Sequence, residues 1–241
     1  MGKIRVAIVG VGNCCSSLVQ GLHYHGNLHG TKGRQEIAYP ELGGYKVDEV
    51  ELVAAFDVDA RKIGKDLSEA IFAEPNNAPE FSDVPKTGVE VLKGELLDGV
   101  GQYASSKVIV DNSPAVDVAK ELKRKDAEVI VNFLPTGAVK ASEHYAECSI
   151  KSRCGFINAT PTAIASNVDW QNKFEQGGVP VAGDDIMDQL GSTILHKTVL
   201  RMLATRGVEI DESYQLDIGG GTESLNALER ERSEIKRKVK S

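Results

Sequence analysis

The sequence has no long apolar run, no cysteine framework and no excess of positive charge. Its 241 residues include only 5% aromatics and carry a formal net charge of -7. No apolar stretch approaches the roughly 20 residues of a membrane-spanning helix, and the run after Met1 is too short for a secretory signal. The negative charge argues against a general nucleic-acid binder. We therefore expect a cytoplasmic protein that binds neither membranes nor nucleic acid.

The cysteines and histidines do not indicate a metal site. The four cysteines form two pairs, Cys14 with Cys15 and Cys148 with Cys154. Neither pair has the usual spacing of a zinc site, so we expect reduced core residues. Three clustered histidines lack a nearby carboxylate or cysteine to complete a ligand set: His23, His25 and His29. We expect loop histidines and no bound metal.

A glycine turn follows directly after the first apolar segment. Residues 3–9 are mostly β-branched and apolar, and Gly10, Gly12 and Asn13 come next. Gly10 allows a tight turn, and Gly12 leaves room for backbone N–H groups to approach a pyrophosphate at a helix N-terminus. Cys15 occupies the third small position, where the helix packs on the strand. The alternative is an ordinary strand–helix turn without a ligand.

An acid follows the second expected strand, residues 50–56. A carboxylate at this place can accept hydrogen bonds from the adenosine ribose of a dinucleotide, and Asp57 occupies it. The distance from the glycines is more than twice the usual value of about 20 residues, and a loop inserted at residues 25–46 explains the excess. Arg61 and Lys62 could instead meet a 2′-phosphate. Because Asp57 comes first, we favour NAD over NADP.

Further short apolar runs predict more strands, each followed by a helical pattern or a loop. They span residues 89–92, 108–110, 129–133, 155–158 and 179–182. Such runs are typical of strands buried on both faces of a parallel sheet. The fold class is therefore α/β, a doubly wound, Rossmann-like sheet with its ligand crevice at the carboxyl ends of the strands.

The pattern changes after residue 188. Helical spacing over residues 189–206 precedes an expected strand at 213–218 and a densely charged helix at 224–241. That helix has too few apolar residues to be covered by what precedes it. We predict an NAD-binding domain at 1–188 and, at 189–241, the start of an α+β catalytic and oligomerisation domain that is not completed in this chain.

Five motifs occur in the order found in a known family. They are residues 8–18, 54–59, 133–135, 183–186 and 225–232. Together they closely resemble the bacterial and archaeal type of myo-inositol-1-phosphate synthase, essentially from end to end. The resemblance implies an isomerase of inositol and phospholipid biosynthesis that converts D-glucose 6-phosphate to 1D-myo-inositol 3-phosphate and recycles NAD in each turnover. It also implies a homotetramer.

The resemblance assigns roles to individual residues. Lys236 and Lys240 match the family's paired lysines, and Asp185 matches an acid near the nicotinamide and substrate, so these three are the candidates for catalysis. Cofactor contacts are implied for a larger set: Gly10, Gly12, Asn13, Asp57, Asp66, Tyr145, Asp184, Asp188, Glu223 and Lys236. From the residues alone, Asp66 could equally be a surface carboxylate and Tyr145 a packed aromatic.

Several positions depart from the family pattern, and the family continues beyond Ser241. The substituted positions are Met187, Asp188, Glu223, Ile235 and Val239. We expect a fragment or a shortened relative with little turnover on its own. Two alternatives stay open. One is an NAD-dependent dehydrogenase of a sugar or polyol phosphate, and the other is a non-catalytic NAD-binding relative.

Overall fold

The computed structural model describes residues 2–27, 38–186, 192–216, 221–226 and 228–240, and its centre is a six-stranded sheet. The strand order is β5–β4–β1–β6–β7–β8, and every neighbouring pair is parallel. The strands are β1 (Ile4–Val9), β4 (Val50–Asp57), β5 (Val91–Lys93), β6 (Val129–Asn132), β7 (Gly155–Asn158) and β8 (Val181–Ala182). The predicted doubly wound parallel sheet is confirmed.

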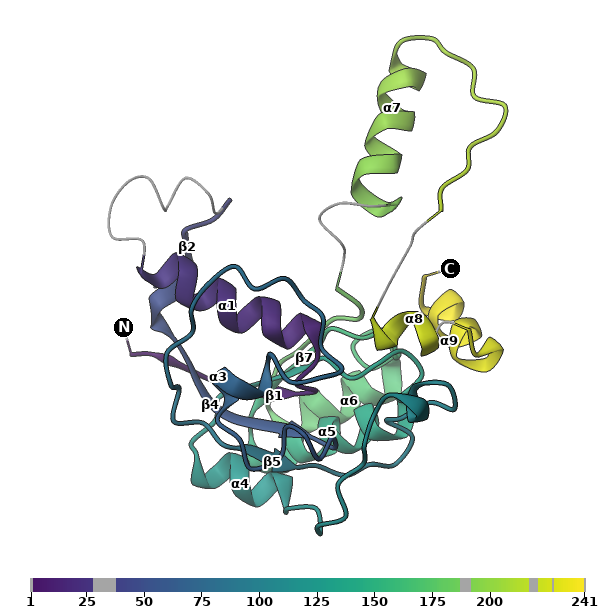
Figure 1. Ribbon diagram of the computed structural model, residues 1–241. Helices are drawn as coiled ribbons and strands as arrows, with labels where there is room; N and C mark the ends of the chain where they lie inside the picture. The colour runs from purple at the N-terminus through teal and green to yellow at the C-terminus, as the bar shows by residue number, and fades with distance from the viewer. Residues whose placement is uncertain (1, 28–37, 187–191, 217–220, 227, 241) are drawn as a thin grey trace.

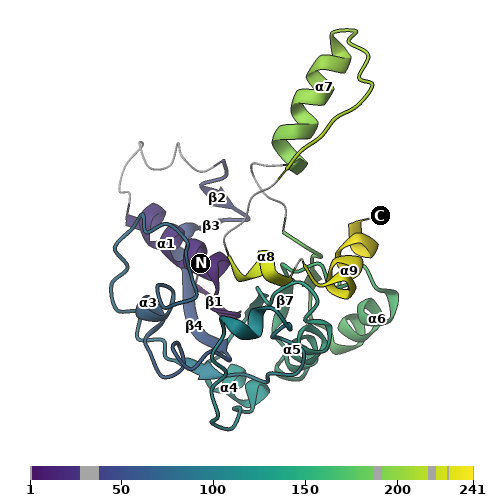
Figure 2. The same ribbon diagram turned by 45° about the vertical axis from the view of Figure 1, so that its right-hand side comes forward.

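Helices cover both faces of this sheet (Figures 1 and 2). The first layer contains α1 (Asn13–Asn27) and α3 (Leu67–Ala70), and the second contains α4 (Val118–Arg124), α5 (Val139–Ser152) and α6 (Val168–Gly177). Side chains alternate between the two layers, as strand geometry requires. In β1, Ile8 packs with the α1 layer, while Ala7 and Val9 pack with the α4–α6 layer. Cys15, in the first turn of α1, is fully buried against the sheet, as the small-residue position predicts.

The strand order reverses between β1 and β6. From β1 the chain builds outward through β4 to β5, and it then crosses back to add β6, β7 and β8 on the other side. The loops after β1 and β6 therefore diverge, and the crevice between them is where doubly wound sheets bind ligands.

Three local expectations need correction. Residues 108–110 do not form a strand, because only an isolated antiparallel bridge joins Val110 to Asp59. The part of the expected strand 213–218 that the structure describes, residues 213–216, is not paired in a sheet. The loop inserted before β4 contains a short antiparallel hairpin of β2 (Glu41–Leu42) and β3 (Tyr45–Lys46), then the 3₁₀ turn η1 (Val47–Glu49). A second 3₁₀ turn, η2 (Ala104–Ser106), lies after β5.

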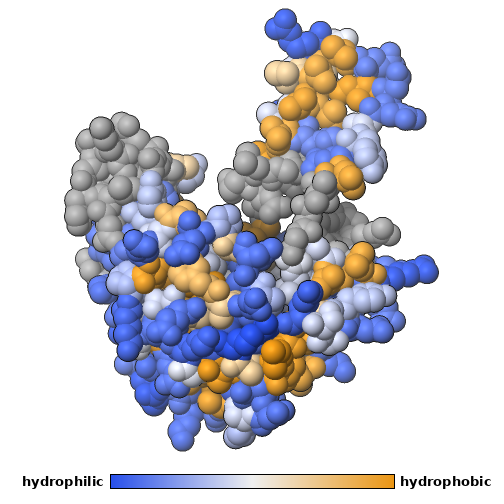
Figure 3. All heavy atoms as spheres, viewed as in Figure 1, coloured by the Kyte–Doolittle hydropathy of each residue, from blue (hydrophilic) through white to orange (hydrophobic). Residues whose placement is uncertain are grey.

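Residues 192–216 form an arm that projects from the body (Figures 1 and 2). It consists of the π-helical turn η3 (Ser192–His196), α7 (Lys197–Thr205) and an extended return segment. Hydrophobic residues gather on the surface of the arm (Figure 3). The large side chains exposed along it include Leu195, Val199, Met202, Val208, Tyr214 and Leu216. The helical pattern predicted for 189–206 is confirmed from residue 192 onward, and residues 189–191 lie outside the described part.

The charged C-terminal segment comes back to the body in two helices, α8 (Thr222–Asn226) and α9 (Arg230–Lys240). We expected this segment to find no cover on what precedes it, and that was wrong for its first half. Asn226 and Arg232 are buried against the body. The contacts are polar, which is why a count of apolar residues did not reveal them.

Candidate functional site

The glycine turn between β1 and α1 uses its two glycines for different reasons. Gly10 has a φ of +87°, its N–H donates to the Phe56 carbonyl at 2.9 Å, and a Cβ added to it would lie 2.9 Å from the Phe133 carbonyl oxygen. The fold itself therefore requires glycine at position 10. A Cβ at Gly12 would meet no atom within 4 Å. Position 12 needs glycine only if something else occupies the space in front of it.

Asp57, at the end of β4, is tied to the glycine turn. One carboxylate oxygen accepts the Val11 N–H at 2.7 Å, and the other accepts the N–H groups of Val58 and Asp59 at 2.7 and 2.9 Å. The carboxylate therefore joins the ends of β1 and β4, which are neighbours in the sheet. It lines the cavity described below and retains acceptor capacity for a ligand.

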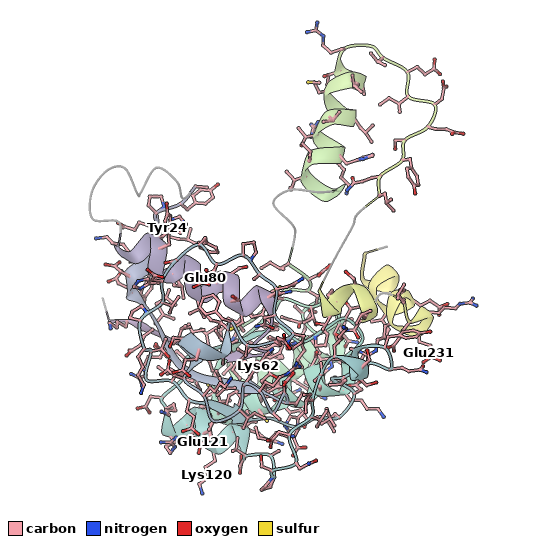
Figure 4. The ribbon with its side chains drawn as sticks, viewed as in Figure 1. Tyr24, Lys62, Glu80, Lys120, Glu121 and Glu231 are labelled. Carbon is pink, nitrogen blue, oxygen red and sulfur yellow. The ribbon has the colours of Figure 1, made fainter. Side chains whose placement is uncertain are left out.

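The two basic residues after Asp57 are already engaged. The Arg61 guanidinium binds Asp59 through two bonds of 3.0 and 2.6 Å, and this ion pair raises the pKa of Arg61. Lys62 is buried near the centre of the body (Figure 4), where its ammonium donates to the Val11 carbonyl at 2.7 Å and to the Asn76 amide oxygen at 2.9 Å. Lys62 therefore stabilises the glycine turn through the Val11 carbonyl. Its sequence position did not reveal this role.

A cavity of about 300 Å³ lies above the carboxyl ends of the strands. It is lined by loops that follow β1, β4, β5, β6 and β7, and by α8. Seven of the predicted site residues line it: Gly10, Gly12, Asn13, Asp57, Tyr145, Asp185 and Glu223. The structure thus brings together most of the predicted set from both ends of the chain.

Asn13 and Tyr145 have structural partners at the cavity wall. The Asn13 amide bonds Asn77 and the Ala78 N–H, which fixes the loop after α3. The Tyr145 ring is buried on α5, its hydroxyl lies where a Cβ on Gly94 would have to be, and burial raises its pKa. Tyr145 is therefore a neutral phenol at any physiological pH. Both residues shape the cavity, and their contact with a cofactor stays a prediction.

Asp66 and Asp184 do not line the cavity. Asp66 caps α3 and accepts from the N–H and hydroxyl groups of Ser68 and Thr87 and from the Gly88 N–H. Burial alone would raise the pKa of Asp66, but these hydrogen bonds outweigh it and hold the pKa well below its usual range. Asp66 thus caps α3 and holds the Thr87–Gly88 turn. Its contact with a cofactor stays a prediction.

Asp184 organises the loop after β7. It accepts the N–H groups of Ile164, Ala165 and Ser166 at 2.9 to 3.0 Å, the Ser166 hydroxyl at 2.7 Å and the Asn158 amide at 2.7 Å. The neighbouring Asp185 instead lines the cavity, with its N–H bonded to the Thr160 carbonyl at 3.0 Å. Of these two acids, only Asp185 lines the cavity, and the ligand contact predicted for each stays a prediction.

The C-terminal segment forms a roof over the cavity, and this roof comprises its described residues 221–226 and 228–232. Glu223 accepts the Thr136 N–H at 3.2 Å and also the Thr136 hydroxyl. Arg232 donates to the Thr136 and Asp98 carbonyls at 2.9 and 2.8 Å and to Glu229 at 2.9 Å. At the other end of the roof, Gly221 lies against Asn13. The roof therefore spans from the glycine turn to the loops after β5 and β6.

The remaining predicted residues are less fully placed. Asp188 lies outside the described residues, as does Met187. Lys236 and Lys240 belong to α9, one helical turn apart in the sequence, and only their backbone is described. The sequence predicted a ligand crevice at the carboxyl ends of the strands, where Thr136 lies, but it assigned no individual role to Thr136, Asn226 or Arg232. Nothing in the charged run 229–234 distinguishes Arg232, because its contacts with the body are to backbone carbonyls 96 and 134 residues away.

Comparison with known proteins matches this arrangement to one family. The inositol-3-phosphate synthase of Mycolicibacterium smegmatis is 48% identical over 240 residues, which cover all of this chain and 66% of that protein. The family model for myo-inositol-1-phosphate synthase matches residues 191–241. The chain belongs to the myo-inositol-1-phosphate synthase family. It spans about two thirds of the length of that mycobacterial relative.

Solved structures support the same fold for this synthase-family chain. The crystal structure of Ari2 superposes with a TM-score of 0.77 at 31% identity, covering 92% of this chain and 66% of the other. A myo-inositol-1-phosphate synthase-related protein from Thermotoga maritima superposes with a TM-score of 0.70, over 98% of this chain and 68% of the other. At 23% identity, that second likeness shows the fold alone. No described helix is long and apolar enough to cross a membrane.

Proposed function

We propose that this chain binds NAD in the cavity and carries the nucleotide-binding part of an inositol-3-phosphate synthase. The reaction converts D-glucose 6-phosphate to 1D-myo-inositol 3-phosphate. The observation that carries the proposal is the cavity, which is built from the glycine turn, Asp57 and the roof in a chain of this family.

The residues present fit a dinucleotide. The space in front of Gly12 is open, and α1 begins at Asn13, so its N-terminal N–H groups and helix dipole are available to a pyrophosphate. Asp57 stands where ribose hydroxyls would donate to it. Arg61 and Lys62 are held by Asp59, Val11 and Asn76. Both cations therefore already have partners among the described residues, and the Lys62 ammonium also lies 3.9 Å from an Asp57 carboxylate oxygen, which supports NAD over NADP.

Bound NAD would supply oxidation at C5 of the substrate and the later re-reduction. The chain's own residues would bind and orient the cofactor and the substrate, and would exclude water from the reacting atoms. Glu223 and Arg232 hold the Thr136 loop in place, and the roof shields the cavity from solvent. We assign Asp185, which lines the cavity close to the loop after β7, to the substrate end.

We assign Lys236 and Lys240 to the substrate. Their spacing of four residues places them on one face of α9. Ammonium groups there would neutralise the substrate phosphate and the oxyanion that develops on enolisation, and a lysine can also carry the proton. Assembly into homotetramers, by analogy with the family, completes the proposal, together with the cytoplasmic location and the division of the chain near residue 188 that the sequence predicts.

The test is to incubate the protein in its full-length form with glucose 6-phosphate and NAD and to measure inositol after phosphatase treatment. The M. smegmatis relative serves as the positive control, and NAD affinity is measured in parallel by calorimetry. Inositol formation without net NADH supports the synthase. NADH that accumulates in proportion to substrate would establish a dehydrogenase instead. Bound NAD with neither product would establish a non-catalytic relative.

A further inference from the structure

A side-chain oxygen in the cavity wall, that of Asn226, accepts no hydrogen bond from the described residues. Asn226, on α8, is 1% exposed, and its side-chain oxygen has no hydrogen-bond partner among the described residues. A buried acceptor without a donor destabilises a folded protein, so native structures keep few of them. Where one persists in the wall of a binding cavity, a donor on the ligand is the natural partner.

The position of Asn226 is fixed by the charged residues of the roof. Glu229 accepts the Tyr103 N–H at 3.2 Å, and Arg232 bonds the Asp98 carbonyl. As a result, the Asn226 side-chain oxygen lies so close to Gly101 that a Cβ added to that glycine would be 2.6 Å away. Asn226 also lines the cavity. The unpaired oxygen is thus held rigidly over the loop that follows β5.

The sheet order indicates which part of a nucleotide would lie there. Strand β5 pairs with β4, on the side of β1 opposite to β6 and β7. Asp57, at the end of β4, marks the ribose of the adenosine half. The nicotinamide half then lies across the switch point, toward Thr136 and Asp185. The loop 94–104 and Asn226 above it therefore belong to the adenosine end of the cavity.

We propose that Asn226 is a nucleotide-contacting residue whose side-chain oxygen accepts a hydrogen bond from an N–H or O–H group of the adenosine half of the cofactor. This inference rests on the proposed binding of NAD. The inference adds that the C-terminal roof contacts the adenosine half of the cofactor directly. Residues from both ends of the chain would then form one nucleotide site.

Thr162 provides a matched control. Its hydroxyl oxygen is also buried without a partner among the described residues, but Thr162 does not line the cavity. Thr162→Val and Asn226→Leu therefore both replace an unsatisfied polar group by an apolar one of similar size. Only the second removes the acceptor that we assign to the nucleotide.

The experiment measures the dissociation constants of NAD, ADP and nicotinamide mononucleotide, together with the melting temperature without ligand. In Asn226→Leu we expect the affinities for NAD and ADP to fall about 10-fold, with the affinity for nicotinamide mononucleotide unchanged. The melting temperature should stay the same or rise, because an unsatisfied buried group is removed. Thr162→Val should leave all three affinities unchanged. Asn226→Ala should repeat the selective loss if leucine does not fit.

Two outcomes would overturn the inference. Unchanged ADP affinity in both Asn226 variants would show that the oxygen meets no adenosine donor. A lower melting temperature with all three ligands weakened alike would show that Asn226 only supports Glu229 and Arg232. If the wild-type protein bound neither NAD nor ADP, the proposed function itself would fail, and that result is separate from both.

Discussion

The floor and the roof of the cavity are built in different ways. The floor, residues 10–13 and 57–62, consists of strand ends and a helix start that adjoin a buried core cluster, to which the fully buried Val11 belongs. The roof, residues 221–226 and 228–232, is held to the body by polar contacts that join residues 87 to 134 positions apart. The floor is part of the folding core, whereas the roof is a polar attachment to it.

This difference predicts where the cavity can open. Breaking the floor requires unfolding of the parallel sheet, but lifting the roof requires the loss of only a few hydrogen bonds and little apolar burial. Ligand binding adds contacts to both surfaces. A nucleotide that touches the floor and the roof together would therefore stabilise the roof far more than the sheet.

The largest effect should come from the floor. Gly12→Val should abolish NAD binding, because its side chain would fill the open space where the pyrophosphate lies. The fold should survive at a cost of about 1 kcal/mol, since nothing in the protein opposes a Cβ there. Gly10→Ala should instead lower the free energy of unfolding by about 1–3 kcal/mol, because its φ and the Phe133 carbonyl require glycine. Calorimetric binding and denaturant melts separate the two. Normal NAD affinity in folded Gly12→Val would remove the pyrophosphate from this turn.

The roof should respond without unfolding of the body. Arg232→Met removes the donor to the Thr136 and Asp98 carbonyls and deprives Glu229 of its ion pair, at a cost of about 2–3 kcal/mol to roof closure. We expect NAD affinity to fall 10- to 100-fold and amide exchange to rise in residues 221–235 only. Arg230→Met is the control, because that side chain is 92% exposed and pairs only with Glu234. Global unfolding in Arg232→Met would mean that the roof is part of the core.

Cofactor choice should be set by the floor. Asp57→Ala removes both the ribose acceptor and the repulsion of a 2′-phosphate, so the preference for NAD over NADP should fall about 10-fold. Affinities for both cofactors in the native and variant proteins measure it. The free energy of unfolding must be followed as well, because Asp57 also holds the Val11 N–H. A native preference for NADP would contradict this role and would point to Arg61.

Sequence reasoning reached the floor and only part of the roof, for a physical reason. Gly10, Gly12 and Asp57 act through local geometry at strand ends, and that geometry is encoded within a few residues of each. The resemblance to a known family was needed to place Glu223 at the site. Arg232 and Asn226 depend on the backbone of distant loops, which carries no residue-specific signal. Asp66 shows the opposite ambiguity, because a cap residue and a ligand residue are the same carboxylate in a sequence, and its cofactor contact stays a prediction.

The smallest effect should come from Asp66, which tests whether it belongs to the floor at all. Asp66→Ala should leave NAD affinity unchanged and lower the free energy of unfolding by about 1–2 kcal/mol at pH 7, because the α3 cap and the Thr87–Gly88 contacts are lost. The folded-state pKa of Asp66 is depressed, so its contribution is fully present above the unfolded pKa of about 3.9. It should disappear as the pH falls further, toward the folded pKa. Denaturant melts of both proteins between pH 7 and pH 2 should therefore show a stability gap that is constant down to about pH 4 and narrows steadily below it. A gap that did not narrow below about pH 4 would show that the hydrogen bonds do not depend on the charge. A loss of NAD affinity at pH 7 would return Asp66 to the cofactor site.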